Sequence, residues 1–223
     1  RRKPRGRIKG YRQITFRRLI MSGVIIHIVD DDPAMLSAIC YFLASEGYDS
    51  KCYRSASEFL EEFQSSEISC IILDVKMPET SGLELFEIIL RRGIDIPIIF
   101  FSGHGDLPMA VNALRKGAFH FLEKPLRPEI FLETVKAALL EDQRRKAGLL
   151  LASQLRQEYQ KLSERELQVL TLIGKALTNK IIAERKGLSE RTIENYRANI
   201  YRKLKVHDVE ELKMALELIG PKK

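Results

Sequence analysis

The sequence has 223 residues, enough for two domains of ordinary size, and its hydrophobic content of 45% supports a buried core in each. The net charge of +7 is unevenly spread: residues 1–20 carry 9 bases and no acid, residues 21–143 carry 10 bases and 20 acids, and residues 144–223 carry 18 bases and 10 acids. No apolar run reaches the ~18 residues of a membrane span, which excludes a transmembrane protein. The basic C-terminal part suggests a polyanionic partner, although charge alone fits an ordinary solvated surface equally well.

Three cysteines, Cys40, Cys52 and Cys70, stand in apolar surroundings without C-x-x-C spacing. We expect small core residues in a reducing compartment and no disulfide framework. Since no signal-peptide pattern is seen either, we expect a cytoplasmic protein.

Residues 1–20 are basic and show no helical or strand periodicity. Met21 stands directly before the first predicted strand, so we interpret residues 1–20 as a disordered upstream extension or an expression remnant. A basic arm that binds nucleic acid is the alternative.

From residue 24 the pattern alternates between strands and helices. Strands are predicted at residues 24–29, 48–53, 69–74, 97–101 and 119–122. Amphipathic helices are predicted at residues 33–45, 57–64, 82–91, 107–116 and from 128 onward. Five strands alternating with five helices predict an α/β domain with a doubly wound parallel sheet over residues 21–142. A partly helical linker is expected over residues 143–160.

Acidic residues follow two of these strands. Asp74 ends the apolar run Cys70–Leu73, and Asp30 and Asp31 follow the first strand. Because the carboxyl ends of parallel strands meet at one edge of the sheet, we expect these carboxylates to lie close together. Such a cluster is costly without a cation, and Mg²⁺ prefers oxygen ligands of this kind. Asp32 precedes Pro33 and is interpreted as a helix cap rather than a ligand.

Two more strand ends supply Ser102, a hydroxyl, and Lys124, an ammonium. With Asp74 as nucleophile, Mg²⁺ and Lys124 are expected to neutralise phosphoryl oxygens and Ser102 to hydrogen-bond one of them. The pattern therefore predicts a site for phosphoryl transfer to Asp74.

The ordered elements V-D-D (29–31), L-D-V-K-M-P-x-x-S-G (73–82), S-G (102–103) and E-K-P (123–125) resemble the receiver domain of two-component response regulators, a flavodoxin-like fold. The resemblance implies that Asp74 is phosphorylated and that Asp30, Asp31, Asp74 and the backbone carbonyl of Lys76 hold Mg²⁺. It also implies switch roles for Ser102, Lys124 and Phe121, and a cis bond between Lys124 and Pro125.

Structural roles and one other enzyme class are the alternatives to these assignments. Phe121 lies in an apolar run and is equally well explained as a core residue. His27 and His104 are interpreted as structural, because no nucleophile or cysteine cluster accompanies them. A phosphatase of the haloacid dehalogenase class needs a second acid two residues after the nucleophile, where this chain has Lys76.

From residue 161 the periodicity is helical throughout. Ser163 and Glu166 form a capping box that opens a helix to about Gly174, and a second helix is predicted over 179–186. A short break with Gly187 separates it from a third helix over 190–204, which is the signature of a helix-turn-helix. A fourth helix, capped by Asp208, ends near residue 220. Residues 161–223 are therefore predicted to form a small all-α DNA-binding domain.

The third helix has a core face formed by Ile193, Tyr196, Ile200 and Leu204 at 100° per residue. Its other faces carry side chains suited to a major groove, where Arg reads guanine and Asn reads adenine. The predicted DNA contacts are Arg191, Thr192, Glu194, Asn195, Arg197, Ala198, Asn199 and Arg202. An ordinary charged helix surface is the alternative.

The runs L-S-E-R-E-L-Q-V-L (162–170), N-K-I-I-A (179–183) and L-S-E-R-T-I-E-N-Y-R-A-N-I-Y-R-K-L (188–204) resemble the LuxR-type helix-turn-helix. With the receiver elements, the whole chain resembles the NarL/FixJ family of transcriptional regulators. This resemblance implies a sensor histidine kinase, double-stranded DNA and RNA polymerase as partners, no membrane, and a homodimer on activation, with no catalytic residues of an enzyme.

The resulting hypothesis is a regulator of transcription switched by phosphorylation of Asp74. The first alternative is a DNA-binding regulator whose receiver is a phosphorylation-independent interaction module. The second is a phosphohydrolase fused to a helical oligomerisation domain, which predicts turnover of phosphate esters and no DNA binding.

Overall fold

The computed structural model describes residues 23–64, 68–103, 107–125 and 127–220. The chain divides into two compact units, one ending at Arg145 and the other beginning at Lys146. Each unit is described by itself.

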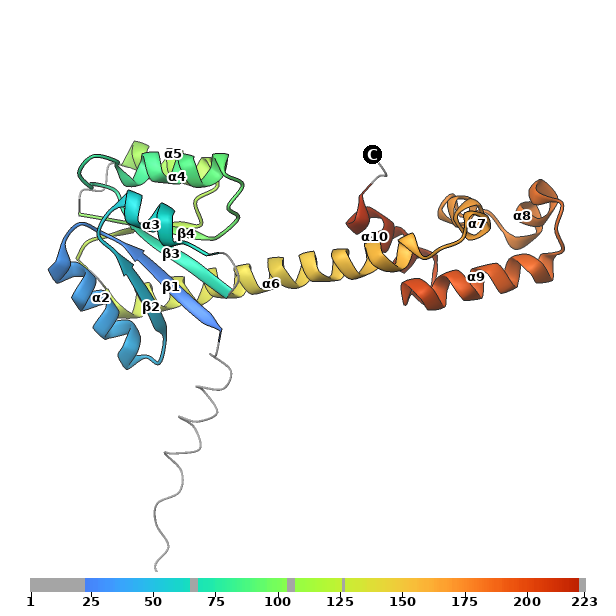
Figure 1. The fold of residues 1–223 in the computed structure, drawn as a ribbon, viewed down its shortest axis with the longest axis horizontal. Coiled ribbons are helices and arrows are strands. Elements are labelled where there is room, and N and C mark those ends of the chain that lie inside the picture. Colours follow the sequence, from blue (N-terminus) through green and yellow to red (C-terminus); the bar gives the residue numbers. More distant parts are fainter. Residues whose placement is uncertain (1–22, 65–67, 104–106, 126, 221–223) are drawn as a thin grey trace, which may run out of the picture. The chain divides into compact units, whose positions relative to one another are not determined.

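The N-terminal unit is built on a five-stranded parallel sheet with the strand order β2-β1-β3-β4-β5 (Figure 1). The strands are β1 (Val24–Val29), β2 (Asp49–Tyr53), β3 (Ile68–Asp74), β4 (Ile98–Ser102) and β5 (His120–Glu123). Their bounds agree with the predicted strands to within one residue. The α/β class and the doubly wound parallel sheet are confirmed.

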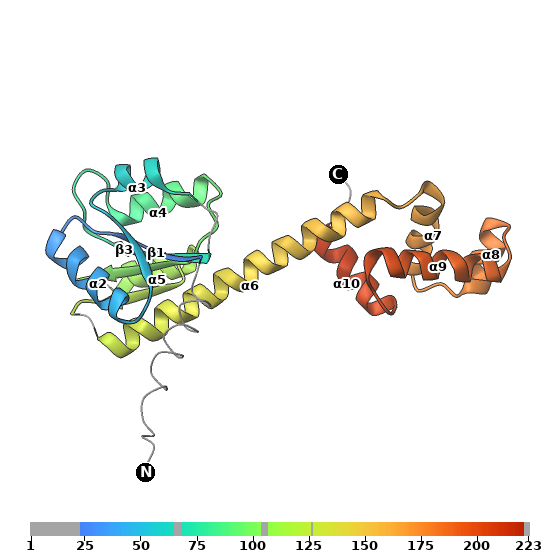
Figure 2. The ribbon, with the colours of Figure 1, turned by 60° about the horizontal axis from the view of Figure 1, so that its bottom comes forward.

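Helices cover both faces of this sheet (Figures 1 and 2). On one face lie α3 (Ala56–Glu62), α4 (Gly82–Arg91) and α5 (Leu107–Arg115). On the other lie α2 (Pro33–Ser45) and the first part of α6 (Pro128–Gln160). Each face has its own apolar core: Phe59, Phe86 and Phe100 belong to the first, and Leu43 and Phe131 to the second.

The strand register brings the carboxyl ends of β1, β3 and β4 to one edge. Val29 pairs with Leu73, and Asp74 pairs with Phe101, so Asp30, Asp74 and Ser102 follow at nearly the same level. The parallel topology thus gathers residues that are up to 72 positions apart in the sequence.

Helix caps hold the first turns of the helices beside this edge. Asp32 caps α2 by accepting a hydrogen bond from the N–H of Ala34 at 2.8 Å, as predicted. Ser81 and Glu84 form a reciprocal capping box at the start of α4. Ser55 caps α3, and the carboxylate of Glu58 accepts from the N–H of Arg54, the residue before the cap.

The cysteines differ from the expectation. Cys40 on α2 and Cys52 on β2 are joined by a disulfide, whereas we expected three free thiols. The reason is topological: β2 is an edge strand packed under α2, which brings positions 12 residues apart in sequence face to face. Cys70 is free and buried, as expected.

The C-terminal unit contains the end of α6 and four further helices: α7 (Glu164–Gly174), α8 (Asn179–Lys186), α9 (Glu190–Leu204) and α10 (Val209–Ile219). Gly187, with φ 63°, ends α8 in the left-handed conformation and allows the sharp turn into α9. Ile173, Ile182, Ile193, Ile200 and Leu212 are fully buried and form the centre of its core. The predicted helical domain with a helix-turn-helix at α8–α9 is therefore present.

None of the helices within the described ranges is both long and apolar enough to cross a membrane.

Candidate phosphoacceptor site and nucleic-acid interface

Lys124 brings the two buried acids at the sheet edge together. Its Nζ donates to Asp30 Oδ2 at 2.9 Å and to Asp74 Oδ1 at 2.7 Å. Asp30 follows β1, Asp74 ends β3, and Lys124 follows β5, so three strands position this one cluster. Both carboxylates are almost fully buried, while the lysine side chain is 18% exposed.

Backbone N–H groups fix the orientation of both carboxylates. The N–H of Asp32 donates to Asp30 Oδ1 at 2.9 Å, and the N–H of Lys76 donates to Asp74 Oδ2 at 2.7 Å. Each carboxylate therefore presents its remaining oxygen to the same cation. A purely structural core needs only apolar packing. Two buried acids held in fixed orientations therefore indicate a site that acts on a charged ligand.

The electrostatic balance of this site shifts two pKa values. Burial raises the pKa of Asp74 above its ordinary value, and the charge of Asp30 acts in the same direction. Hydrogen bonds from Lys124 and Lys76 oppose the shift without cancelling it. Burial acts to lower the pKa of Lys124, but its bonds to Asp74 and Asp30 outweigh that effect, so its pKa is raised and the ammonium persists.

Ser102 and Phe121 lie beside this cluster. Ser102 is buried at the end of β4, and its carbonyl accepts a hydrogen bond from the N–H of Lys124 at 2.8 Å. Phe121 on β5 is partly buried, with its ring centroid 6.2 Å from that of Phe100. The Lys124–Pro125 peptide bond is cis, as the resemblance to receiver domains implied.

Metal binding was predicted at Asp30, Asp31, Asp74 and the carbonyl of Lys76. Within the described ranges, no three His, Cys, Asp or Glu side chains are grouped so as to hold a metal, and Asp31 is exposed. The donor chemistry nevertheless fits Mg²⁺, because Asp30 and Asp74 already share one cation through a carboxylate oxygen each. The full ligand set stays a prediction.

Gly82 has a role that the sequence reasoning missed. A Cβ atom on Gly82 would lie 2.0 Å from the backbone oxygen of Asp74, and its N–H donates to the carbonyl of Val75 at 3.0 Å. The first turn of α4 thus packs directly against the backbone that carries Asp74. Gly82 is the first residue of the helix predicted over residues 82–91, and its spacing in the sequence gives no sign of this close approach.

The candidate DNA contacts lie on α9 as follows. Most of the predicted side chains are exposed: Arg191, Glu194, Asn195, Ala198, Asn199 and Arg202. Thr192 is partly buried and its hydroxyl bonds to that of Ser189, the cap of the helix, at 2.8 Å. The predicted core residues Ile193, Ile200 and Leu204 are buried, and Tyr196 packs against the same core.

Arg197 faces the interior of its unit. Its guanidinium donates to the carbonyl of Leu177 at 3.3 Å and to the hydroxyl of Tyr201 at 3.2 Å. Arg197 follows the buried Ile193 by four residues and therefore shares its side of the helix, a signal that the spacing offered. Its guanidinium therefore bonds both to α9 itself and to the segment before α8.

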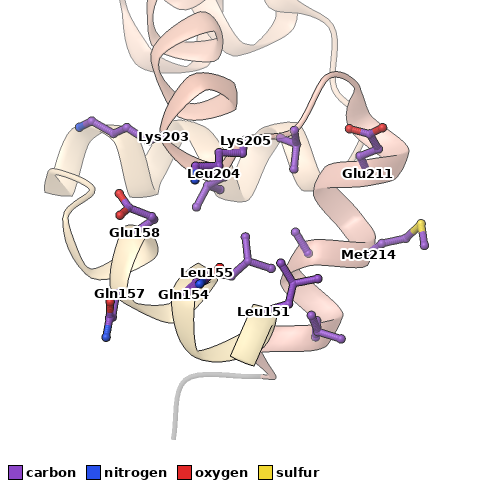
Figure 3. Close-up of a pocket in the computed structure, with 13 residues that line it drawn as sticks. Leu151, Gln154, Leu155, Gln157, Glu158, Lys203, Leu204, Lys205, Glu211 and Met214 are labelled. Carbon is purple, nitrogen blue, oxygen red and sulfur yellow. The ribbon is translucent and has the colours of Figure 1, made fainter. Parts of the chain in front are cut away.

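A groove of about 560 Å³ lies between the last turns of α6, the C-terminal end of α9 and α10. Figure 3 shows Leu155 near its centre and Met214 extending to its outer side. Its lining includes none of the predicted DNA-contacting residues. The groove and the exposed face of α9 are therefore separate surfaces of the C-terminal unit.

Comparison with known families accounts for both units. Residues 26–136 match the family described as "Response regulator receiver domain", and residues 160–215 match "Bacterial regulatory proteins, luxR family". A receiver domain implies a sensor kinase as partner, and a luxR-family domain implies DNA binding.

Individual relatives match over most of their length. The response regulator TodT of Pseudomonas putida is 42% identical over 188 residues, covering 84% of this chain and 83% of TodT. The transcriptional regulatory protein FixJ of Rhizobium meliloti is 36% identical over 197 residues, covering 88% of this chain and 97% of FixJ. Among solved structures, the response regulator StyR has a TM-score of 0.74 at 35% identity, covering 87% of this chain and 98% of StyR. The chain therefore belongs to the NarL/FixJ family of response regulators, which are transcription regulators and not enzymes.

Proposed function

We propose that this response regulator is switched by phosphorylation of Asp74 by a sensor histidine kinase, and that the switch promotes operator binding. The observation that carries the proposal is the pair of bonds from Lys124 Nζ to Asp74 and Asp30 at the carboxyl edge of the sheet. A buried nucleophile with a cation beside it is the arrangement that phosphoryl transfer needs.

The chemistry follows from these positions. An oxygen of Asp74 attacks the phosphorus of a phosphohistidine, the P–N bond breaks, and its electron pair returns to the imidazole. Lys124 neutralises charge on the phosphoryl oxygens, and the hydroxyl of Ser102 donates a hydrogen bond to one of them. Mg²⁺, when held by Asp30, Asp31, Asp74 and the carbonyl of Lys76, supplies further charge neutralisation.

The switch requires a difference in binding between two states. A shift from 1:99 to 99:1 needs about 5.5 kcal/mol of preference of the phosphoryl group for one state. In the active state Ser102 and Phe121 move inward, and the surface around residues 110–122 pairs two receivers. The resulting homodimer places two α9 helices in the half-sites of a dyad operator, where RNA polymerase is engaged.

The test is sedimentation with Mg²⁺ and beryllofluoride, a mimic of the acyl phosphate. Wild type is expected to shift from monomer to dimer, and Asp74→Asn is expected not to respond, because a neutral amide replaces the nucleophilic carboxylate. Asp49→Asn, at the exposed start of β2, is the matched control and should behave as wild type. If neither wild type nor the variant responds, the phosphorylation-independent alternative replaces this proposal.

A further inference from the structure

A polar cluster ties α6 to the sheet at the edge opposite Asp74. We name it the exit clamp and define it by Ser69, Asp95, Asp142 and Arg145. Asp142 Oδ2 accepts a hydrogen bond from the N–H of Ser69 at 2.8 Å. The guanidinium of Arg145 donates to Asp142 Oδ1, to Asp95 Oδ1 and to the carbonyl of Asp95. One arginine thus joins α6 to the segment before β4, and one carboxylate joins α6 to β3.

The burial of Asp142 within this cluster argues against a role in stability alone. The side chain of Asp142 is 0% exposed and that of Arg145 is 22% exposed. Charged groups at such depth carry a desolvation cost that apolar side chains of similar volume avoid. Arg145 Nε is also buried without a hydrogen-bond partner among the residues that the structure describes. The cluster fixes the orientation of α6 relative to the sheet, because the guanidinium of Arg145 is held by three acceptors.

The place of the clamp on the strands links it to the phosphoacceptor site. Ser69 lies at the start of β3, and the other end of β3 is Asp74. Asp95 lies three residues before β4, and the other end of β4 is Ser102. The two strands that carry the nucleophile and the predicted switch hydroxyl at one edge therefore carry the two anchors of α6 at the other.

The clamp also marks the boundary between the units. The first unit ends at Arg145, and α6 continues without a break as one helix to Gln160. Residues 146–160, which we call the linker helix, continue directly from the turn of α6 that carries the clamp.

We propose that the exit clamp is the positioning element that couples the state of Asp74 to the linker helix. The inference rests on the proposed phosphorylation of Asp74. A small displacement of β3 or β4 at the phosphorylated edge moves Ser69 or Asp95 at the other edge, because a paired strand is stiff along its length. The planar guanidinium of Arg145 follows Asp95, and α6 either turns with it or loses these bonds.

The test uses the full chain with two clamp variants and one control. Arg145→Gln removes the bonds to Asp95, and Asp95→Asn weakens the same link at a side chain that is 69% exposed, so that the fold is retained. Glu62→Gln breaks a comparable exposed ion pair, Lys51–Glu62, between β2 and α3 and away from α6. Phosphate uptake from phosphoramidate is measured by gel shift, and amide hydrogen exchange of residues 137–160 is measured with and without Mg²⁺ and beryllofluoride.

Wild type and Glu62→Gln should show a change in exchange of about threefold or more over residues 137–160 when beryllofluoride is added. Both clamp variants should lose that change while phosphate uptake stays within about twofold of wild type. A change of wild-type size in the clamp variants overturns the proposal, and so does a loss of phosphate uptake, which would make the cluster part of the site itself.

If the proposed phosphorylation of Asp74 is wrong, the same experiment gives a different result. If wild type takes up no phosphate, Asp74 is not a phosphoacceptor, and the clamp is judged without beryllofluoride. In Arg145→Gln, the amide hydrogens of residues 140–150 should then exchange about fivefold faster than in wild type. Unchanged exchange there would show that the cluster positions nothing.

Discussion

At the scale of single residues, Lys124 determines the resting electrostatics of the site. Two carboxylates buried at one edge of a sheet repel each other, and an ammonium that donates to both offsets part of that cost. Burial is the chief cause that raises the pKa of Asp74, and the charge of Asp30 acts in the same direction. Asp74, the proposed nucleophile, is therefore hydrogen-bonded to a cation that the chain itself supplies.

Gly82 gives the sharpest prediction at this scale. Gly82→Ala places a methyl group 2.0 Å from the carbonyl oxygen of Asp74, so α4 or the β3–α4 loop must move. We expect a loss of about 1–3 kcal/mol in the free energy of unfolding, measured with urea, together with slower phosphate uptake.

Gly148→Ala is the matched control for this substitution. Gly148 lies within α6, and a Cβ there meets no atom within 4 Å. Alanine should therefore stabilise this helix, by about 0.5–1 kcal/mol. Equal effects of the two substitutions would show that the close approach at Gly82 does not exist.

At the scale of elements, the first turn of α7 depends on Glu166. Its carboxylate accepts from the N–H of Ser163 at 2.7 Å and from Lys203 Nζ at 2.8 Å, which joins α7 to α9. Burial acts to raise the pKa of Glu166, but the bonds from Lys203 and Ser163 outweigh it and hold the pKa below the ordinary 4.5.

A pH dependence of stability follows from that shift. Because the folded pKa lies below the unfolded value, the stabilisation by Glu166 is complete above about pH 4.5 and is lost as pH falls through the folded pKa. Glu166→Gln should remove this part of the acid dependence in urea unfolding curves of the full chain. Glu164→Gln, an exposed first-turn acid, should leave it unchanged. Ser163→Ala should cost about 1 kcal/mol at neutral pH.

The sequence was sufficient for most elements because their signals are local. Asp32 before Pro33 marks the start of α2, and Gly187 marks the end of α8, and both are read from neighbouring residues. The site lies at the ends of strands. The predicted parallel sheet therefore also implied that Asp30, Asp74 and Lys124 would lie close together.

What the sequence did not reveal depends on contacts between distant segments. Arg145 reaches Asp95 across 50 positions, and Cys40 meets Cys52 because an edge strand lies beneath α2. Gly82 matters only through its distance to the backbone of Asp74. These three features need coordinates, because no periodicity or spacing encodes which side chains of separate elements face each other.

At the scale of the whole molecule, two units with separate cores predict two unfolding transitions. Ile71 is fully buried in the N-terminal unit, and Ile193 is fully buried in the C-terminal unit. Ile193→Ala is expected to cost about 2–5 kcal/mol and to lower only one calorimetric transition. Ile71→Ala should lower only the other. A single transition that both substitutions shift equally would show that the units unfold together.

The two edge strands of the sheet have a consequence for self-association. Strand β5 has four residues with His120 and Glu123 exposed at its ends, and β2 exposes Asp49 and Lys51. Short edges with charged side chains discourage the addition of another strand, which is how many β-sheets avoid aggregation. Two copies of this receiver are therefore expected to meet through side chains on helices and strand ends, and not by extending one continuous sheet through backbone hydrogen bonds.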